Sequence, residues 1–273
     1  MRKVLFYLTL LGILGTTVFG MSAYEVMEKA KGKEAAEFQY SRQKMILVDK
    51  KNRKRVREFI GYSKKIDGEN KSESCFKFIA PAEVKGTSML MWDYDVNNKE
   101  DITWLSLPGI KKGAPRQISS SRNDKNASFM GSDFTLDDLG ELELQKDNFN
   151  FVNSKESIID GKECYIIESI PKQLNKYEIY SKRIFWIRKD NMVIAKVEYY
   201  DRDNKLFKVL TTKNLRSKEG GSSINKSGKY WYIKDMAMKN VQTGHSTYIF
   251  LLEINYPKQM DKKLFLPSTF YRK

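Results

Sequence analysis

Short apolar runs separated by turn residues dominate the chain from residue 38 to the C-terminus. Representative runs cover residues 45–48, 87–92 and 192–200, and Pro108 follows another at residues 102–107. Runs that recur every ~10 to 15 residues, with Gly, Pro, Asn and Asp between them, are typical of antiparallel strands joined by turns. Neither a βαβ rhythm nor an internal repeat is evident. The pattern predicts a mainly β domain with meander connections.

Several predicted strands are apolar on both faces. In residues 246–256, Phe250 and Leu252 share one face, while Ile249 and Leu251 lie on the other. An antiparallel sheet with one solvated face alternates more cleanly. The residues alone therefore leave two arrangements open: a second layer covers the sheet, or the sheet curves around an apolar interior.

Residues 127–139, near the middle of the chain, follow neither a strand period nor a long helical period. Gly131 permits a bend, and Asp133 can cap a short helical turn over residues 135–138. The segment can be a connector packed into the core or an apolar plug over the sheet. Its apolar residues are Phe129, Met130, Phe134, Leu136 and Leu139.

The N-terminal residues have the pattern of a secretory signal. Arg2 and Lys3 precede an apolar run over residues 4–18, and small residues offer cleavage after Gly20 or Ala23. An uncleaved anchor is the alternative, although the run is shorter than the roughly 20 residues of a membrane span. We therefore expect a signal peptide at 1–20 and a single domain at 21–273. Within it, residues 23–33 are predicted to form a short helix with Met27 on its apolar face.

The chain is strongly basic, with a formal net charge of +15. Loss of residues 1–20 leaves +13, because Arg2 and Lys3 are the charged side chains in that segment. A nucleic-acid module would combine basic residues with stacking aromatics in a recognisable motif, and none is present. Attraction to an anionic membrane surface and a general compositional bias toward lysine both remain open.

Residues suited to catalysis or metal binding are scarce. Cys75 and Cys164 are far apart in the sequence, so they can pair in an oxidising compartment or remain buried thiols. His245 is the single histidine and lies in a predicted hairpin turn, without a G-x-S-x-G motif elsewhere. Adjacent Asp137 and Asp138 would not face each other on a helix. We expect no enzyme, no metal and no cofactor.

Four segments resemble the outer-membrane lipoprotein-sorting protein family, the relatives of the periplasmic lipoprotein carrier LolA. Residues 128–139 (SFMGSDFTLDDL) are similar to its signature, and residues 78–90 to its F-x-x-P-x-x-x-x-G-T strand pair. Residues 104–112 with 116–118 are similar to its W-x-Y-L-P and basic segment, with Ser106 in place of Tyr. Residues 264–272 resemble its closing strand, so the likeness extends over most of the chain.

The resemblance implies a strongly curved antiparallel sheet, an incomplete (half) β-barrel, with a few helices covering its concave face. It also implies an apolar cavity for acyl chains. The expected function is a periplasmic carrier or chaperone for lipoprotein or lipid cargo, working with an inner- or outer-membrane partner or transporter. The alternative is a non-catalytic envelope scaffold or an accessory subunit of a hydrophobe-exporting transporter.

Candidate site residues follow from the same resemblance. We expect a plug over the cavity and a set of large apolar residues in the cavity wall. The plug comprises Phe129, Met130, Gly131, Phe134 and Leu139, and the wall comprises Trp92, Trp104, Trp186 and Phe250.

Overall fold

The fold is known from a computed structural model. It describes residues 21–32, 36–65, 71–94, 99, 101–108, 115–119, 126–140, 144, 149–153, 157–174, 178–219 and 229–272. The predicted signal segment, residues 1–20, lies outside the described residues. Within the described part of the chain, no helix combines the length and the apolar character needed to cross a bilayer.

One antiparallel sheet of 14 strands forms the body of the molecule, in the order β6-β5-β4-β3-β2-β1-β14-β13-β12-β11-β10-β9-β7, with β8 paired to β9. The strands are β1 (Phe38–Val48), β2 (Lys54–Lys65), β3 (Lys71–Ala80), β4 (Ser88–Tyr94), β5 (Ile102–Ser106), β6 (Arg116–Ser119), β7 (Phe149–Asn153), β8 (Ser157–Ile159), β9 (Lys162–Pro171), β10 (Lys182–Arg188), β11 (Ile194–Tyr200), β12 (Leu206–Glu219), β13 (Lys229–Asn240) and β14 (Ser246–Asn255).

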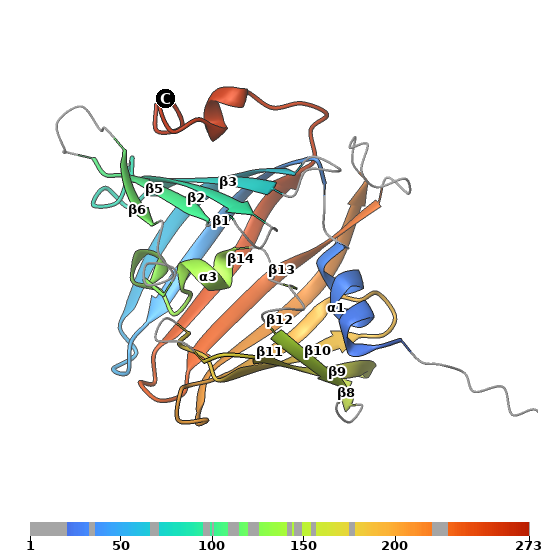
Figure 1. Cartoon of the computed structure of the whole chain (residues 1–273). Helices are drawn as coiled ribbons and strands as arrows, with labels where there is room; N and C mark the ends of the chain where they lie inside the picture. The colour runs from blue at the N-terminus through green and yellow to red at the C-terminus, as the bar shows by residue number, and fades with distance from the viewer. Residues whose placement is uncertain are drawn as a thin grey trace, which may run out of the picture.

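Most neighbouring strands are consecutive in the sequence, which confirms the predicted meander. The exception at the centre is β1, which pairs with β14 and so joins the two ends of the domain in mid-sheet. Among the described strands, β6 and β7 end the order and the sheet is not closed into a barrel. Figure 1 shows the sheet bending around two short helices, so that it has an inner and an outer face.

The inner face carries the main hydrophobic core. Helix α1 (Ala23–Gly32) lies against β7 and β9, and its Val26 and Met27 are fully buried. The middle of the sheet contributes Met45, Phe59 and Ile249 to the same core. Residues 127–140, which we call the plug, contain the 3-10 helix η2 (Phe129–Gly131) and the helix α3 (Leu136–Leu139). The inner face is therefore covered by α1 and the plug (Figure 1).

A smaller core lies on the outer face, beneath the C-terminal segment. Phe270 packs there against Cys75 and Leu90, next to the 3-10 helix η3 (Lys262–Phe265). Cys75 and Cys164 are both buried free thiols, which settles the pairing left open by the sequence. Burial raises the pKa of the Cys75 thiol from 9.0 to about 12. Cys75 therefore acts as a small apolar side chain in this core.

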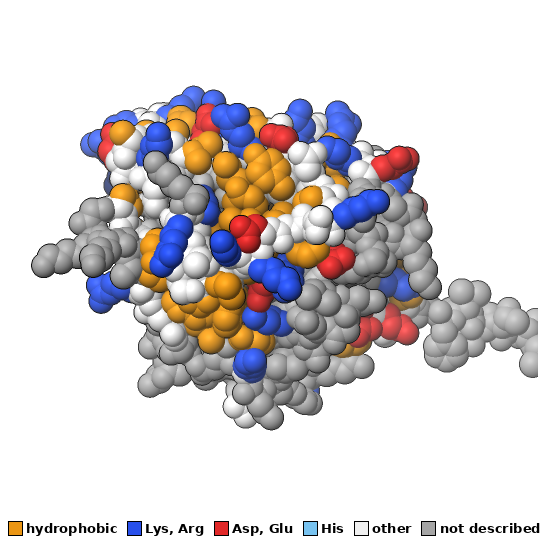
Figure 2. Space-filling model, turned by 90° about the horizontal axis from the view of Figure 1, so that it is seen from above, with side chains coloured by type: hydrophobic (Ala, Val, Ile, Leu, Met, Phe, Trp, Pro, Cys, Tyr) orange, Lys and Arg blue, Asp and Glu red, His pale blue; other side chains and the backbone are white. Residues whose placement is uncertain are grey.

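Charge is spread over the surface. Figure 2 shows the face at the top of Figure 1, where basic side chains lie dispersed among a few acidic ones and apolar side chains gather between them. The basic character of the chain is thus not confined to a single patch on this face.

Candidate functional site

The plug is built around a tight bend. Ser128 and Thr135 form an isolated antiparallel bridge, and the Phe129 amide donates to the Phe134 carbonyl at 2.8 Å. Between them, Met130 and Gly131 have φ values of 51° and 71°. Gly131 adopts this left-handed conformation without steric cost, as the sequence predicts, whereas Met130 does so against its preference.

Helix α3 is capped differently from the prediction. Thr135, and not Asp133, is the N-cap: its hydroxyl accepts from the Asp138 amide at 3.1 Å. The Asp138 carboxylate in turn accepts from the Thr135 amide at 2.8 Å, which completes a capping box. Asp133 is instead free to bond across to the sheet.

An aromatic cluster fixes one side of the plug. Phe129 is 1% exposed and its ring lies 5.6 to 6.0 Å from three rings of β2 and β3. Contacts in this range are favourable beyond the apolar area that they bury. The three partners are Phe59, Phe76 and Phe78.

A buried ion pair fixes the other side. Lys208 of β12 is 2% exposed, and its Nζ lies 2.8 Å from Oδ2 of Asp138 and 3.0 Å from the Asp133 carbonyl. The Tyr180 hydroxyl donates to the same carboxylate at 3.0 Å. Burial, followed by the negative charge of Asp138, raises the pKa of Tyr180 well above its usual value. Tyr180 therefore stays protonated and remains a hydrogen-bond donor.

Two arginines bind the plug from two other strands. Arg183 of β10 forms an ion pair with Asp137. Burial lowers the pKa of Arg183, but the combined effect of Asp137, Tyr180, Tyr199 and Asp138 outweighs it, and the pKa is raised. Arg57 of β2 donates to the Met130 carbonyl. These contacts hold the plug to both halves of the sheet, because β2 and β10 lie on opposite sides of the central β1–β14 pair.

Asp133 connects the plug to the β13–β14 hairpin. Its Oδ2 accepts from the Thr247 hydroxyl at 2.7 Å and lies 3.0 Å from Nδ1 of His245. His245 does lie in the predicted hairpin turn, but its ring faces the plug as well as solvent. The contacts of the plug thus hold its three carboxylates in place: Lys208 pairs with Asp138, Arg183 pairs with Asp137, and Thr247 donates to Asp133. The described residues contain no group of three or more His, Cys, Asp or Glu side chains that could hold a metal ion.

A cavity of about 500 Å³ remains between α1, α3 and the inner face of β10–β13. Polar and charged side chains form part of its lining. They are Ser63, Lys64 and Lys65 of β2, Ser72 and Ser74 of β3, Asp93 of β4, Lys31 of α1, Asp137 and Asp138 of α3, Arg183 of β10 and Thr212 of β12. The apolar part of the lining is formed by Ala30, Phe134, Leu139, Phe185, Ile194, Val197, Leu210, Ile233 and Met236. The cavity thus has the amphipathic lining that a lipid-like molecule would need.

The five predicted plug residues occupy different environments. Phe134 and Leu139 line the cavity, whereas Phe129 and Met130 pack into the core beside it. Gly131 is exposed at the bend.

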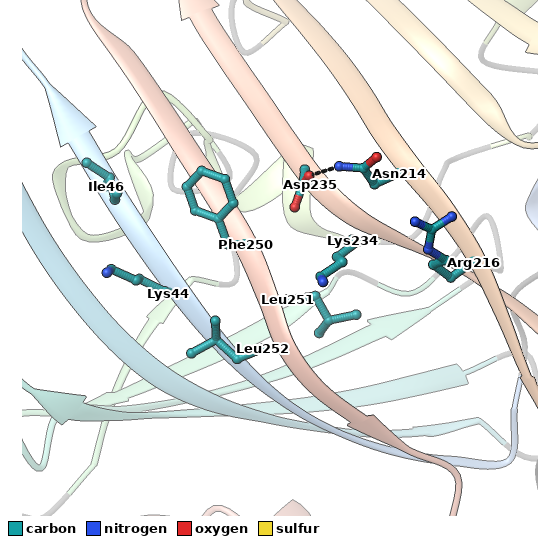
Figure 3. Close-up of a pocket in the computed structure, with 9 residues that line it drawn as sticks. All are labelled: Lys44, Ile46, Asn214, Arg216, Lys234, Asp235, Phe250, Leu251 and Leu252. Atoms are coloured by element: carbon teal, nitrogen blue, oxygen red, sulfur yellow. Dashed lines mark hydrogen bonds between the residues drawn. The ribbon is translucent and has the colours of Figure 1, made fainter.

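The four expected wall residues lie on the outer face, which corrects that prediction. Trp92 and Trp104 pack against each other at 4.7 Å beneath the C-terminal segment, and the Trp92 Nε1 donates to the Phe265 carbonyl at 3.2 Å. Trp186 lies beneath the Lys196 ammonium, 4.3 Å from its ring centroid. Phe250 lines a separate outer hollow (Figure 3). Alternation explains the difference, because their strand neighbours Met91, Phe185 and Ile249 occupy the inner core.

The sequence interpretation missed the basic and hydroxyl partners of the plug. A signal was present at Lys208, a lone charge in the run Leu206-Phe-Lys-Val-Leu210. A charged residue at a core position is rarely left unpaired. Which carboxylate would meet it could not be seen, since Asp138 is 70 residues away. The other missed partners are Arg57, Tyr180, Arg183 and Thr247.

Comparison with known proteins gives related solved structures. A domain from Vibrio parahaemolyticus, provisionally assigned as an outer membrane lipoprotein-sorting protein, has a TM-score of 0.78 and 27% identity, over 91% of this chain and 98% of its own. A DUF1329 family protein from Desulfovibrio piger has a TM-score of 0.77 and 27% identity, over 89% and 95% of the two chains. These matches confirm the resemblance drawn from the sequence motifs.

A LolA superfamily protein from Nitrosomonas europaea shares the fold, with a TM-score of 0.64 and 16% identity over 90% of this chain and 98% of its own. A family model described as "-like: Uncharacterized protein" matches residues 70–272. None of the curated proteins matches the chain.

Proposed function

The chain belongs to the family whose model covers residues 70–272 and has the fold of LolA superfamily proteins, and from this we propose that it is an exported, non-catalytic carrier of lipid-like cargo. The cargo would be lipoprotein acyl chains or another lipid, delivered through the periplasm toward the outer membrane. The likeness to the Vibrio parahaemolyticus lipoprotein-sorting domain supports this proposal.

The inner cavity is the observation that carries the proposal. Its volume of about 500 Å³ falls in the range of roughly 300–1,000 Å³ of small-molecule sites. Transfer of an acyl chain from water into an apolar site is worth about 0.8 kcal/mol per CH₂ group. An apolar lining formed by Val197, Leu210 and Met236 would therefore hold a chain against water without a specific polar contact.

The plug and α1 have separate roles in this proposal. The plug would form a fixed wall of the cavity, because Phe134 and Leu139 line it while Lys208 and Arg183 hold α3 in place. Helix α1 borders the same cavity through Ala30. Release of the cargo would require exchange with a membrane or with a partner protein.

Native mass spectrometry with lipid extraction tests the proposal on the exported protein purified without harsh detergent. We expect bound species of lipid mass that disappear on denaturation. Met236→Trp would fill part of the cavity and reduce the bound lipid at least ~10-fold while leaving the circular dichroism spectrum unchanged. Ile158→Trp adds the same bulk at a side chain that is 69% exposed and should retain the lipid.

A lipid-free mass for the unmodified protein, with no uptake of a fluorescent fatty-acid probe, would contradict the carrier. The non-catalytic envelope scaffold would then be the better explanation of the same fold. Equal loss of lipid in the Met236 and Ile158 variants would place the bound lipid outside the cavity.

A further inference from the structure

An apolar patch lies on the outer face of the sheet, away from the cavity. We call it the outer patch, and it consists of Ile46, Val56, Tyr248, Phe250 and Leu252. Val56, Tyr248 and Leu252 are 43%, 39% and 50% exposed. Large side chains with this exposure are unremarkable singly, but a contiguous group on neighbouring strands indicates an interaction surface.

Strand register makes the outer patch continuous. Val56 of β2 is directly opposite Ile46 of β1, and Ile46 is opposite Tyr248 of β14. Phe250 and Leu252 follow Tyr248 at every second residue of β14, and both line the outer hollow of about 430 Å³. Figure 3 shows Ile46, Phe250 and Leu252 around this hollow. Directly opposite side chains are close enough to contact each other.

Several basic residues lie next to the outer patch. Lys44, Arg216 and Lys234 line the hollow beside the apolar side chains (Figure 3). Lys54 of β2 is directly opposite Val48 of β1, and Lys239 of β13 is directly opposite Ser246 of β14. Both lysines therefore lie beside the row of outer-face side chains that contains Tyr248. The surface therefore combines exposed apolar groups with several neighbouring cations.

The acidic residues near the outer patch have local partners. Asp235 accepts a hydrogen bond from Asn214, as Figure 3 shows. Glu58 forms an ion pair with Arg42 at 2.7 Å. Glu253 is an exposed acid at the far end, where it accepts from Asn255 at 2.8 Å. Cations outnumber these acids around the patch, so its electrostatic complement is anionic.

We propose that the outer patch docks onto a bilayer surface that contains anionic phospholipids. Lysine and arginine side chains near such a surface are attracted to its headgroups, and exposed apolar side chains can enter the boundary between headgroups and acyl chains. Tyr248 suits that boundary because it combines an apolar ring with a polar hydroxyl.

The arrangement of the patch favours a membrane over a protein partner. Neighbouring strands are about 4.8 Å apart, so each charged side chain of this surface lies close to an apolar one. Mobile headgroups can rearrange around each lysine, whereas a folded partner would need a fixed complementary set. A second copy of the chain is disfavoured, because like charges would repel across the interface. Docking through the outer face would leave the inner cavity and α1 accessible.

Vesicle flotation tests this proposal with the exported protein. We expect binding to vesicles of phosphatidylcholine with phosphatidylglycerol, weak binding to phosphatidylcholine alone, and weakening by added salt. Lys44→Glu combined with Lys234→Glu should weaken binding by about 30-fold, since each cation contributes to the attraction. Tyr248→Ser combined with Leu252→Ser should weaken it with less change in the salt dependence.

The matched control is Lys162→Glu combined with Lys189→Glu. It makes the same change in net charge at two ion pairs of 3.5 Å on another part of the surface. We expect near-normal binding for this control and for Met236→Trp, which alters the cavity alone. Vesicle binding is therefore expected even if the cavity holds no cargo.

Equal affinity for the two kinds of vesicle would overturn the proposal. So would equal losses in the patch variant and the control, because binding would then follow net charge and not this surface. An acidic protein as the true occupant would appear as absent vesicle binding together with patch-dependent binding of a purified envelope protein.

Discussion

Helix α1 and the plug cover the same inner face of the sheet by different physical means. The buried side chains of α1 are all apolar, namely Ala23, Val26, Met27 and Ala30. The plug also buries apolar groups, but in addition its carboxylates bond to Lys208, Arg183 and Thr247.

The difference matters because the two kinds of contact respond differently to displacement. Apolar packing is non-directional, so a helix can shift and recover much of its contact. A buried ion pair loses far more when its partners separate, because each charge is left without water. The plug is therefore specified in one position, whereas the apolar contacts of α1 specify its position less strictly.

Removal of the plug's central cation should have the largest effect. Lys208→Met leaves Asp138 buried without its ion pair, and we expect a loss of about 3–5 kcal/mol in the free energy of unfolding. Urea denaturation measures this loss. Lys205→Met, at an exposed neighbour, should change the free energy of unfolding by less than about 0.5 kcal/mol. A loss below about 1 kcal/mol in Lys208→Met would mean that the ion pair does not hold the plug.

Truncation of the apolar face of α1 should have the next largest effect. Met27 is fully buried, so Met27→Ala should cost about 2–5 kcal/mol. Amide hydrogen exchange separates the two regions: exchange should accelerate in α1 for Met27→Ala and in the plug for Lys208→Met. Glu28→Ala is the exposed control on the same helix. Faster exchange in the plug for both core variants would show that the two regions open together.

The hydroxyl of Tyr180 should contribute less. Tyr180→Phe removes a hydrogen bond to the Asp138 carboxylate, and we expect a loss of about 1.5–3 kcal/mol at neutral pH. Thermal or urea unfolding measures it, and Tyr248→Phe, at an exposed ring, is the control. An unchanged stability would indicate that water replaces the hydroxyl.

The same tyrosine gives the plug an alkaline pH dependence. Its pKa is raised in the folded protein, so the unfolded chain loses the proton first as pH rises above 10.0, the usual value. The unfolded state then binds fewer protons, and the stability falls with increasing pH. Burial also raises the pKa of Tyr199, so this side chain contributes to the same fall in stability. Tyr180→Phe should reduce this slope, whereas Met27→Ala should leave it unchanged.

Loss of the α3 cap should have the smallest effect. Thr135→Ala removes the acceptor for the Asp138 amide and should cost about 1 kcal/mol. Thr135→Ser keeps a hydroxyl in place and should restore most of the stability. If serine and alanine behave alike, the capping hydrogen bond is not what positions Asp138 for Lys208.

The sequence by itself determined the class of secondary structure and the bend in the plug. Turn residues between apolar runs predict the antiparallel meander, and these are local signals that survive in any tertiary context. The bend was predictable in the same way, because Gly131 tolerates the left-handed conformation observed there. The family motifs, centred on the plug, were sufficient to identify the open, curved sheet.

Tertiary structure alone decided which side of each strand faces inward. Trp92 and Phe250 are as apolar as their inner neighbours Met91 and Ile249, and a shift of one residue exchanges the two faces. It also decided which charges meet, since Lys208 and Asp138 are 70 residues apart and share no local pattern. Local sequence specifies backbone conformation, but the pairing of distant side chains depends on how the whole sheet curves.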